Sequence, residues 1–171
     1  MRIGNFRAYL IVAIFSLIYG TVRFSSTLQA AHIFDRRDRV DVATLHLQGE
    51  FVESNLGAVR AGDGSSTIHM IAEKYVFVPA CVTAPVGVPI RLRITSADSA
   101  HGFKIAGSEV KTVPGSVTEI HLRFPTAGKY EFYCDEFCGP GHHAMMGRIV
   151  AVLENQFQPQ LSDRGAACGQ P

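Results

Sequence analysis

Residues 90–95, IRLRIT, alternate between apolar side chains and polar ones. A two-residue period of this kind is typical of a strand that buries one face. The pattern recurs in residues 120–124 and 130–134, and the turn-forming stretches PVGVP, VPGS and PTAGK separate the segments. Several short strands with one buried face predict an all-β protein, a sandwich or barrel of Greek-key type, beginning near Thr67.

The last of these segments leads into the run YCDEFCGPGHHAM, which brings four soft or borderline metal ligands close together: Cys134, Cys138, His142 and Met145. Ligands of this kind select copper over magnesium or calcium. One cysteine, two histidines and a weak axial methionine would describe a mononuclear blue-copper site for electron transfer. Because two thiolates can instead bridge two copper ions, the second cysteine favours a binuclear electron relay with no site for a substrate.

His101 follows the alternating strand at 90–95 and is the best candidate for the second histidine. With it, the sequence resembles subunit II of the haem–copper respiratory oxidases, which carries the binuclear CuA centre. The pattern of that family is a histidine, a long gap and then Cys-x-Glu-x-Cys-x-x-x-His-x-x-Met. The resemblance extends from about Ile68 to Glu154, and every position of the pattern is matched: His101, Cys134, Glu136, Cys138, His142 and Met145.

The resemblance implies a role for each matched residue. Cys134 and Cys138 would bridge both copper ions, and each of the two histidines, His101 and His142, would bind one ion. The Met145 thioether would be a weak ligand to one copper, and the backbone carbonyl of Glu136 would be a weak ligand to the other. In many family members the side chain at the position of Glu136 also helps to hold magnesium at the contact with subunit I.

The resemblance also narrows the expected fold to a cupredoxin-like sandwich. Its last two strands would be Tyr130–Cys134 and Gly147–Leu153, joined by the ligand loop. His101 would lie on a neighbouring loop, so that distant sequence positions meet at one end of the sandwich.

The ligand loop leaves two alternatives open. Cys134 and Cys138 could form a disulfide, because an exported domain lies in oxidising surroundings. His143 and Met146 adjoin the matched histidine and methionine, and a slip of one residue would select them instead. The family spacing favours the earlier residue of each pair.

The remaining histidines and cysteines lack metal-ligand spacing. His121 alternates outward along its strand and is predicted to be solvated. Cys81 and Cys168 could pair in an oxidising compartment, or Cys81 could be a small buried thiol. Three more histidines are predicted to be surface groups: His32, His46 and His69.

The N-terminal region predicts membrane contact. Residues 8–24, AYLIVAIFSLIYGTVRF, are uncharged until Arg23 and would span roughly 26 Å as a helix, near the lower limit for a bilayer core of about 30 Å. Arg2 and Arg7 precede this run, so the positive-inside rule places the N-terminus in the cytoplasm and the domain outside. A signal peptide cleaved near Ala30 is the alternative, and the domain is exported in either case.

We therefore expect a membrane anchor at 1–30, a polar linker at 31–66, the cupredoxin domain at 67–154 and a flexible tail at 155–171. The linker prediction depends on charges of both signs and on Gly/Ser stretches. The net charge is +1 for the 171 residues, and the part after the apolar run is mildly acidic. This charge gives no support for nucleic-acid binding.

The resemblance implies an electron-transfer subunit of a respiratory terminal oxidase, in contact with membrane lipid at the outer face of a bacterial-type plasma membrane. It would accept electrons from a cytochrome c-type donor and pass them to haem in subunit I, where oxygen is reduced to water. The chain itself would hold no oxygen-reducing site. Many family members use a tryptophan-containing cluster for donor entry, but this chain has no tryptophan. Tyr75 and Phe77 could substitute, or they could be core aromatics.

Two other classes of protein use related sites. A free-standing copper carrier would bind one copper per chain and use one of the two cysteines. A reductase of the nitrous oxide type would need a large catalytic domain, for which 171 residues leave no room.

Overall fold

The computed structural model describes residues 38–60 and 62–159, and within these ranges the chain forms an all-β sandwich with four short 3-10 turns. The predicted fold class is confirmed. The strands are β1 Gly57–Arg60, β2 Ser66–Glu73, β3 Val76–Val78, β4 Cys81–Pro85, β5 Ile90–Ser96, β6 His101–Ile105, β7 Ser108–Thr112, β8 Thr118–Leu122, β9 Gly128–Tyr133 and β10 Met146–Val152.

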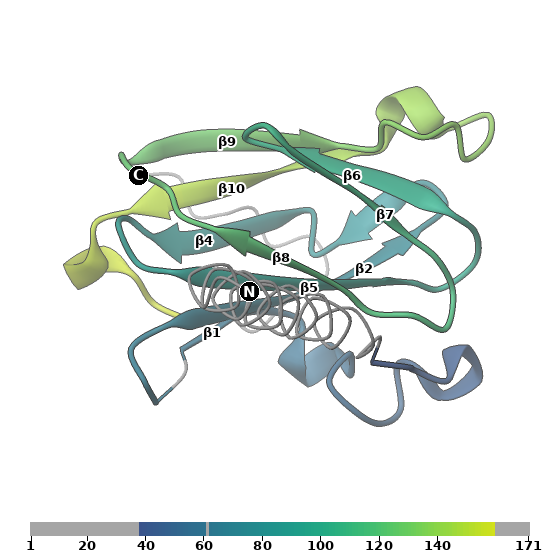
Figure 1. Cartoon of the computed structure of the whole chain (residues 1–171), viewed down its shortest axis with the longest axis horizontal. Coiled ribbons are helices and arrows are strands. Elements are labelled where there is room, and N and C mark those ends of the chain that lie inside the picture. Colours follow the sequence, from purple (N-terminus) through teal and green to yellow (C-terminus); the bar gives the residue numbers. More distant parts are fainter. Residues whose placement is uncertain (1–37, 61, 160–171) are drawn as a thin grey trace, which may run out of the picture. The chain divides into compact units, whose positions relative to one another are not determined.

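Two five-stranded sheets form the layers of the sandwich (Figure 1). One sheet has the order β1-β2-β5-β8, with β3 paired to β2, and the other has the order β4-β10-β9-β6-β7. Most neighbours are antiparallel, but β2 pairs with β5 and β4 with β10 in parallel. Such parallel pairs need crossover connections, so the chain passes between the layers as the Greek-key prediction requires.

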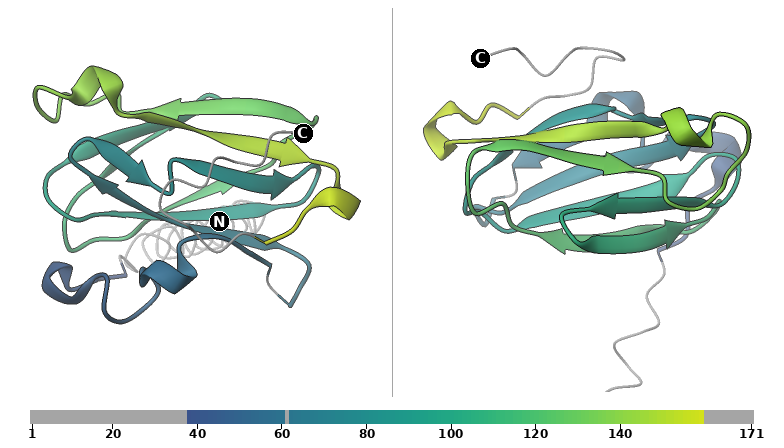
Figure 2. Two further views of the ribbon diagram at one scale, coloured as in Figure 1. Left: turned by 180° about the vertical axis from the view of Figure 1, so that it is seen from behind. Right: turned by 90° about the horizontal axis from the view of Figure 1, so that it is seen from above.

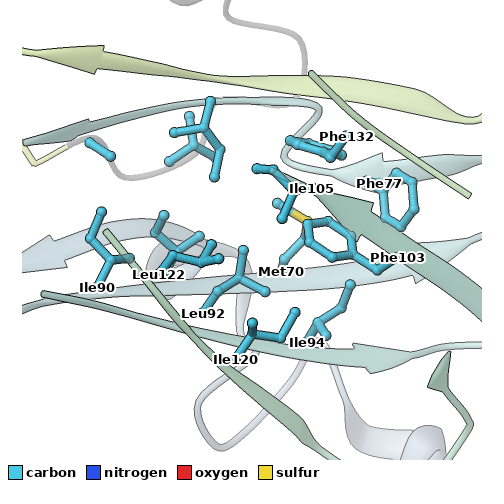
Figure 3. Close-up of a cluster of buried hydrophobic side chains, with 14 of the residues drawn as sticks. Met70, Phe77, Ile90, Leu92, Ile94, Phe103, Ile105, Ile120, Leu122 and Phe132 are labelled. Carbon is cyan, nitrogen blue, oxygen red and sulfur yellow. The ribbon is translucent and has the colours of Figure 1, made fainter. Parts of the chain in front are cut away.

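The core lies between the two sheets, and the alternating residues fill it as predicted (Figure 3). Ile90, Leu92 and Ile94 are buried, whereas Arg91 between them is exposed. The core is dense in aromatic rings, and Phe77, Phe103 and Phe132 pack against one another with ring centroids 5.1–5.4 Å apart. Because Phe77 is only 1% exposed, it is a core aromatic and offers no surface to an electron donor.

Residues 38–60 fall within the predicted polar linker, yet they pack on the sandwich. Leu45, Phe51 and Leu56 are buried in a second cluster with Ile71 and Val117. This part of the chain is therefore structured rather than a loose tether. Its buried apolar residues Leu45, Phe51 and Leu56 are five or six positions apart and follow neither a helical nor a strand period, so the pattern does not reveal them.

Arg93 ties this segment to the sheet. Its guanidinium donates hydrogen bonds to Glu50 at 2.6 and 2.7 Å, and it also contacts Asp38 on the segment and Glu119 on β8, each at 2.7 Å. His69 lies beside the same cluster, with Nε2 3.5 Å from a Glu50 oxygen. The prediction that His69 is a surface group is wrong, because the folded segment covers it and leaves it 9% exposed.

Acid should weaken this attachment. Burial alone would raise the pKa of Glu50, but hydrogen bonds from His69 and Arg93 outweigh it and lower the pKa from 4.5 to about 2. A carboxylate with a depressed pKa in the folded state stabilises the fold above pH 4.5, and this contribution is lost as the pH falls toward 2. We expect the free energy of unfolding, measured by urea unfolding, to fall less in Glu50→Gln than in the wild type between pH 4.5 and pH 2.

The matched control is Glu131→Gln, at an exposed position on β9, which should keep the wild-type acid dependence. Equal acid dependence of the Glu50→Gln variant and the wild type would contradict the assignment.

The described residues contain no long apolar helix of the kind that crosses a bilayer. The predicted span at residues 8–24, the anchor at 1–30 and the part of the tail from residue 160 onward lie outside the described residues.

Candidate metal centre

The loop between β9 and β10 projects beyond the ends of the strands at one end of the sandwich, drawn in lime green in Figures 1 and 2. The Cys134 amide donates to the Met145 carbonyl at 3.0 Å and closes the base of the loop. Further along, the His142 amide donates to the Gly139 carbonyl at 3.0 Å and begins a short 3-10 turn, His142–Ala144. Backbone bonds thus fold the loop back on itself and bring its four candidate ligands together.

Three sulfur atoms form the centre of the site. The Sγ atoms of Cys134 and Cys138 are 3.6 Å apart, and both cysteines are free thiols. The Met145 Sδ lies 3.7 Å from Cys138 Sγ, and the His142 Nδ1 lies 3.8 Å from the same sulfur. With metal–sulfur bonds of about 2.3 Å, both thiolates can bind one ion at this separation.

Burial keeps the metal-free Cys138 thiol protonated. Loss of solvent around the sulfur, together with the neighbouring Cys134, raises the pKa of Cys138 to about 11. A metal ion must therefore displace a proton to bind here, and metal binding at such a site depends on pH.

His101 approaches the sulfurs from a different strand, β6. It is the first residue of β6 rather than a loop residue, and a ligand atom of its fully buried ring lies within 4.8 Å of the two cysteine sulfurs. Its Nε2 is 2.8 Å from Asp98 Oδ1, while its Nδ1 is buried without a hydrogen-bond partner. When the Asp98 carboxylate accepts a hydrogen bond from Nε2–H, Nδ1 is left with a free lone pair. A metal-binding histidine in a protein usually has this arrangement, with one ring nitrogen hydrogen-bonded and the other bound to the metal.

Asp98 is itself held in place. The Lys74 amide donates to its Oδ2 at 2.7 Å, and the Ser99 amide donates to its Oδ1 at 2.6 Å. Partial burial would raise the pKa of Asp98, but hydrogen bonds from His101 and from these amides lower it. The carboxylate is therefore anionic and fixes the orientation of the His101 ring. The sequence carries a hint of this role, because an aspartate three residues before a ligand histidine lies within reach of it.

Replacing Asp98 with alanine should weaken metal binding without abolishing it. Groups that orient a ligand histidine typically contribute about 10- to 100-fold to metal affinity. We expect a loss in this range, measured by competition with a chelator of known copper affinity. Asp98→Asn, which keeps a hydrogen-bonding side chain, should fall between the wild type and Asp98→Ala, and equal affinities of all three proteins would contradict the role.

Glu136 contributes through its backbone. Its carbonyl oxygen is 3.1 Å from Cys134 Sγ, close to the sulfur cluster, whereas its side chain points away and binds Lys111 Nζ at 2.7 Å. Asp135 packs instead over Gly102, with one carboxylate oxygen buried and unpartnered. Burial and the charge of Glu109 raise the pKa of Asp135.

The structure distinguishes the neighbouring candidates for the loop ligands. Met145 is 1% exposed and its Sδ lies 3.7 Å from Cys138 Sγ, whereas Met146 is 59% exposed. His142 is half-buried beside Cys138, whereas His143 is exposed, with its ring centroid 5.2 Å from that of His142. This geometry favours the register with His142 and Met145.

Tyr75, for which the sequence left donor entry and core packing as alternatives, contacts the ligand loop. Its ring lies directly against the backbone of Gly139 and Gly141, so closely that a Cβ atom at either glycine would collide with it. The side chain is half-buried and packs on the edge of the core. Tyr75 thus packs against the loop and supports it. In the sequence, this contact is indicated only by the two glycines, which leave room for the ring.

Among the described residues, the group of potential ligands that converges on the cysteine sulfurs does not include His46, His69, His121 or Cys81. His121 is solvated as predicted, with a side chain 77% exposed, and His46 is half-buried. Cys81 is disulfide-bonded, so the alternative of a free thiol is wrong. Its predicted pairing with Cys168 stays a prediction, because Cys168 and His32 lie outside the described residues.

Comparison with known proteins agrees with this arrangement. The family model of the cupredoxin-like domain matches residues 54–151. Cytochrome c oxidase subunit 2 of Thermus thermophilus is 32% identical over 115 residues, which cover 66% of this chain and 85% of the relative. A chain in the cryo-EM structure of a heme-copper terminal oxidase dimer superimposes with a TM-score of 0.54 and 28% identity, covering 85% of this chain and 99% of that chain.

Another relative matches a shorter part of the chain. Heme-copper oxidase subunit 2 of Aeropyrum pernix is 32% identical over 80 residues, which cover 44% of this chain and 34% of the relative.

A two-sheet sandwich with soft ligands gathered at one end defines the class of cupredoxin-like domains, in which copper is the implied metal. Within that class, the chain belongs to the cytochrome c oxidase subunit 2 family. The residues present fit copper, because a ring nitrogen of the buried His101 lies within 4.8 Å of two cysteine sulfurs, and the Met145 thioether adjoins one of these sulfurs.

Proposed function

We propose that this chain is the CuA-bearing, electron-transferring subunit of a respiratory terminal oxidase. The observation that carries the proposal is the convergence of two free thiols, 3.6 Å apart, with a ring nitrogen of His101 that lies within 4.8 Å of both sulfurs. A mononuclear site needs only one of these thiols. Two thiolates that both lie within 4.8 Å of a ring nitrogen of His101 suit a pair of bridged copper ions.

Each ligand has a distinct part in this proposal. Cys134 and Cys138 would hold the two ions through their thiolates, and His101 and His142 would each bind one ion. Met145 and the backbone carbonyl of Glu136 would be weak ligands. When bound, the copper pair supplies a one-electron store, while the buried ligands hold the geometry fixed during electron transfer.

The donor side of the site lies at His142 and Phe137. The His142 ring is half-buried, and its centroid lies 5.8 Å from that of Phe137, whose side chain is 79% exposed. Met146 adds a second exposed apolar side chain next to the loop. An exposed aromatic ring beside a ligand histidine suits the contact with a c-type cytochrome whose haem edge is apolar, since aromatic residues dominate such contacts.

Phe137→Ala should slow reduction of the bound copper by a reduced c-type cytochrome roughly tenfold, because a central aromatic contact of the encounter surface is lost. The copper spectrum should not change, since the Phe137 side chain holds no metal ligand. Leu153→Ala is the control: Leu153 is also exposed and apolar, but it follows the far end of β10. Stopped-flow rates that fall equally in both variants would contradict the assignment of the donor surface.

The same proposal includes subunit I as the electron acceptor and a bacterial-type plasma membrane as the location, with the domain on the outer side. It is supported by the family relationship and by the apolar run at residues 8–24 behind two arginines. Protease added to intact spheroplasts should cleave the domain, and protection of fragments that contain Cys134 would contradict this orientation.

Copper counting tests the central claim. The chain loaded with copper should hold two ions and show a delocalised mixed-valence spectrum. A fully loaded chain with one copper and an ordinary blue-copper spectrum would instead identify the alternative, a free-standing exported copper carrier. Magnesium at Glu136 is not included in the proposal, because the Glu136 carboxylate is already paired with Lys111.

A further inference from the structure

Glu136 connects the sulfur cluster to β7. Its backbone carbonyl lies 3.1 Å from Cys134 Sγ, and its carboxylate lies 2.7 Å from the Lys111 ammonium. Lys111 is on β7, directly across from Gly102, and Gly102 follows the ligand His101 on β6. The ion pair therefore joins the peptide beside Cys134 to the strand pair that carries His101.

The close approach at Gly102 fixes this arrangement. A Cβ atom at Gly102 would lie 2.7 Å from the Glu136 amide nitrogen, so the Asp135–Glu136 peptide rests on the bare backbone of β6. With the peptide fixed there, the Glu136 side chain starts beside β7, where Lys111 faces it. The pairing is thus determined by the fold of the loop as well as by the reach of two long side chains.

A divalent cation at Glu136 does not fit these surroundings. Magnesium requires an octahedron of oxygen ligands and is usually held by one or two carboxylates with several waters. Among the described residues, the group of three or more potential ligands that converge on one point consists of His101, Cys134 and Cys138, and it contains no carboxylate. Asp135, the nearest acidic residue in sequence, packs over Gly102 rather than beside the Glu136 carboxylate.

We propose that Lys111 is a built-in cation that takes the place of a divalent metal ion at Glu136 and clamps the ligand loop to β7. This inference rests on the proposed CuA function. The ammonium neutralises the carboxylate and repels a second cation, so no divalent ion needs to bind at Glu136. As a positive charge near the copper pair, Lys111 also favours the reduced state and raises the reduction potential of the site.

The test uses the assembled oxidase purified from cells grown with Mn²⁺, which substitutes for magnesium and is visible by electron paramagnetic resonance. The wild type should show the copper signal and no stoichiometric Mn²⁺. Lys111→Met should lower the copper reduction potential more than Lys104→Met does. Lys104 is the matched control, because it is also a β6–β7 lysine paired with a carboxylate, Glu109 at 3.0 Å, but it does not contact the Glu136 side chain.

The possible results distinguish a failure of the Lys111 proposal from a failure of the proposed function. The proposal is supported if the wild type lacks Mn²⁺ and Lys111→Met either acquires one Mn²⁺ per copper pair or shows the larger fall in potential. It is overturned if the wild type carries one Mn²⁺ that Glu136→Gln removes, or if Lys111→Met neither binds Mn²⁺ nor shifts the potential beyond the control. A wild type without the mixed-valence copper signal would instead overturn the proposed function.

Discussion

Cys138→Ser is expected to abolish the two-copper state. A serine hydroxyl stays protonated near neutral pH and is a hard oxygen ligand, so it cannot replace a soft bridging thiolate. Cys138 Sγ also lies within 3.8 Å of ligand atoms of three other candidates, Cys134, His142 and Met145. We expect at most one copper per chain, counted by mass spectrometry, and loss of the mixed-valence spectrum.

Variants at neighbouring positions are the controls for this experiment. His143→Ala and Met146→Leu should keep both ions, because both side chains are exposed and the structure places neither against the sulfurs. Met145→Leu should keep copper but change the reduction potential, since a weak axial ligand tunes a site more than it holds it. Loss of copper from His143→Ala, with copper retained in His142→Ala, would show that the assigned register is wrong by one residue.

The parts of the fold that follow a period were predictable from the sequence. Each strand with strict alternation, such as β5, buries its apolar face, because a one-residue slip would turn charged side chains into the core. The segment at residues 38–60 was not predictable in this way. Its burial depends on single residues such as Phe51, which fill gaps that only the finished sandwich creates.

The ligand loop was predictable because metal chemistry fixes residue type and spacing together. Its supports were not, because they come from elements distant in sequence and use ordinary residues. Tyr75 comes from the turn between β2 and β3, and Lys111 from β7. Neither has a spacing that marks it, and their roles emerge only when the strands bring them to the loop. His69 illustrates the same limit, since its burial follows from a segment that the sequence suggested was loose.

Because the ligand loop packs closely on β6, we expect a second large effect on the copper site when a side chain is added at Gly102. In Gly102→Ala, the new methyl group would collide with the Asp135 carboxylate and lie 2.7 Å from the Glu136 amide nitrogen. The carboxylate could move, but the amide belongs to the backbone of the ligand loop. We expect the loop to shift away from His101, with loss of the mixed-valence spectrum and at least a tenfold loss of copper affinity, comparable to the loss of a group that orients a ligand.

Two further variants make the Gly102→Ala result specific. Gly62→Ala, where a Cβ atom meets nothing within 4 Å, should keep both copper ions and change the free energy of unfolding by less than about 0.5 kcal/mol. Adding Asp135→Ala to Gly102→Ala removes the side-chain collision and leaves the backbone collision. Because the backbone contact is the one that displaces the ligands, the double variant should stay defective, whereas recovery of the wild-type spectrum would show that only the carboxylate was in the way.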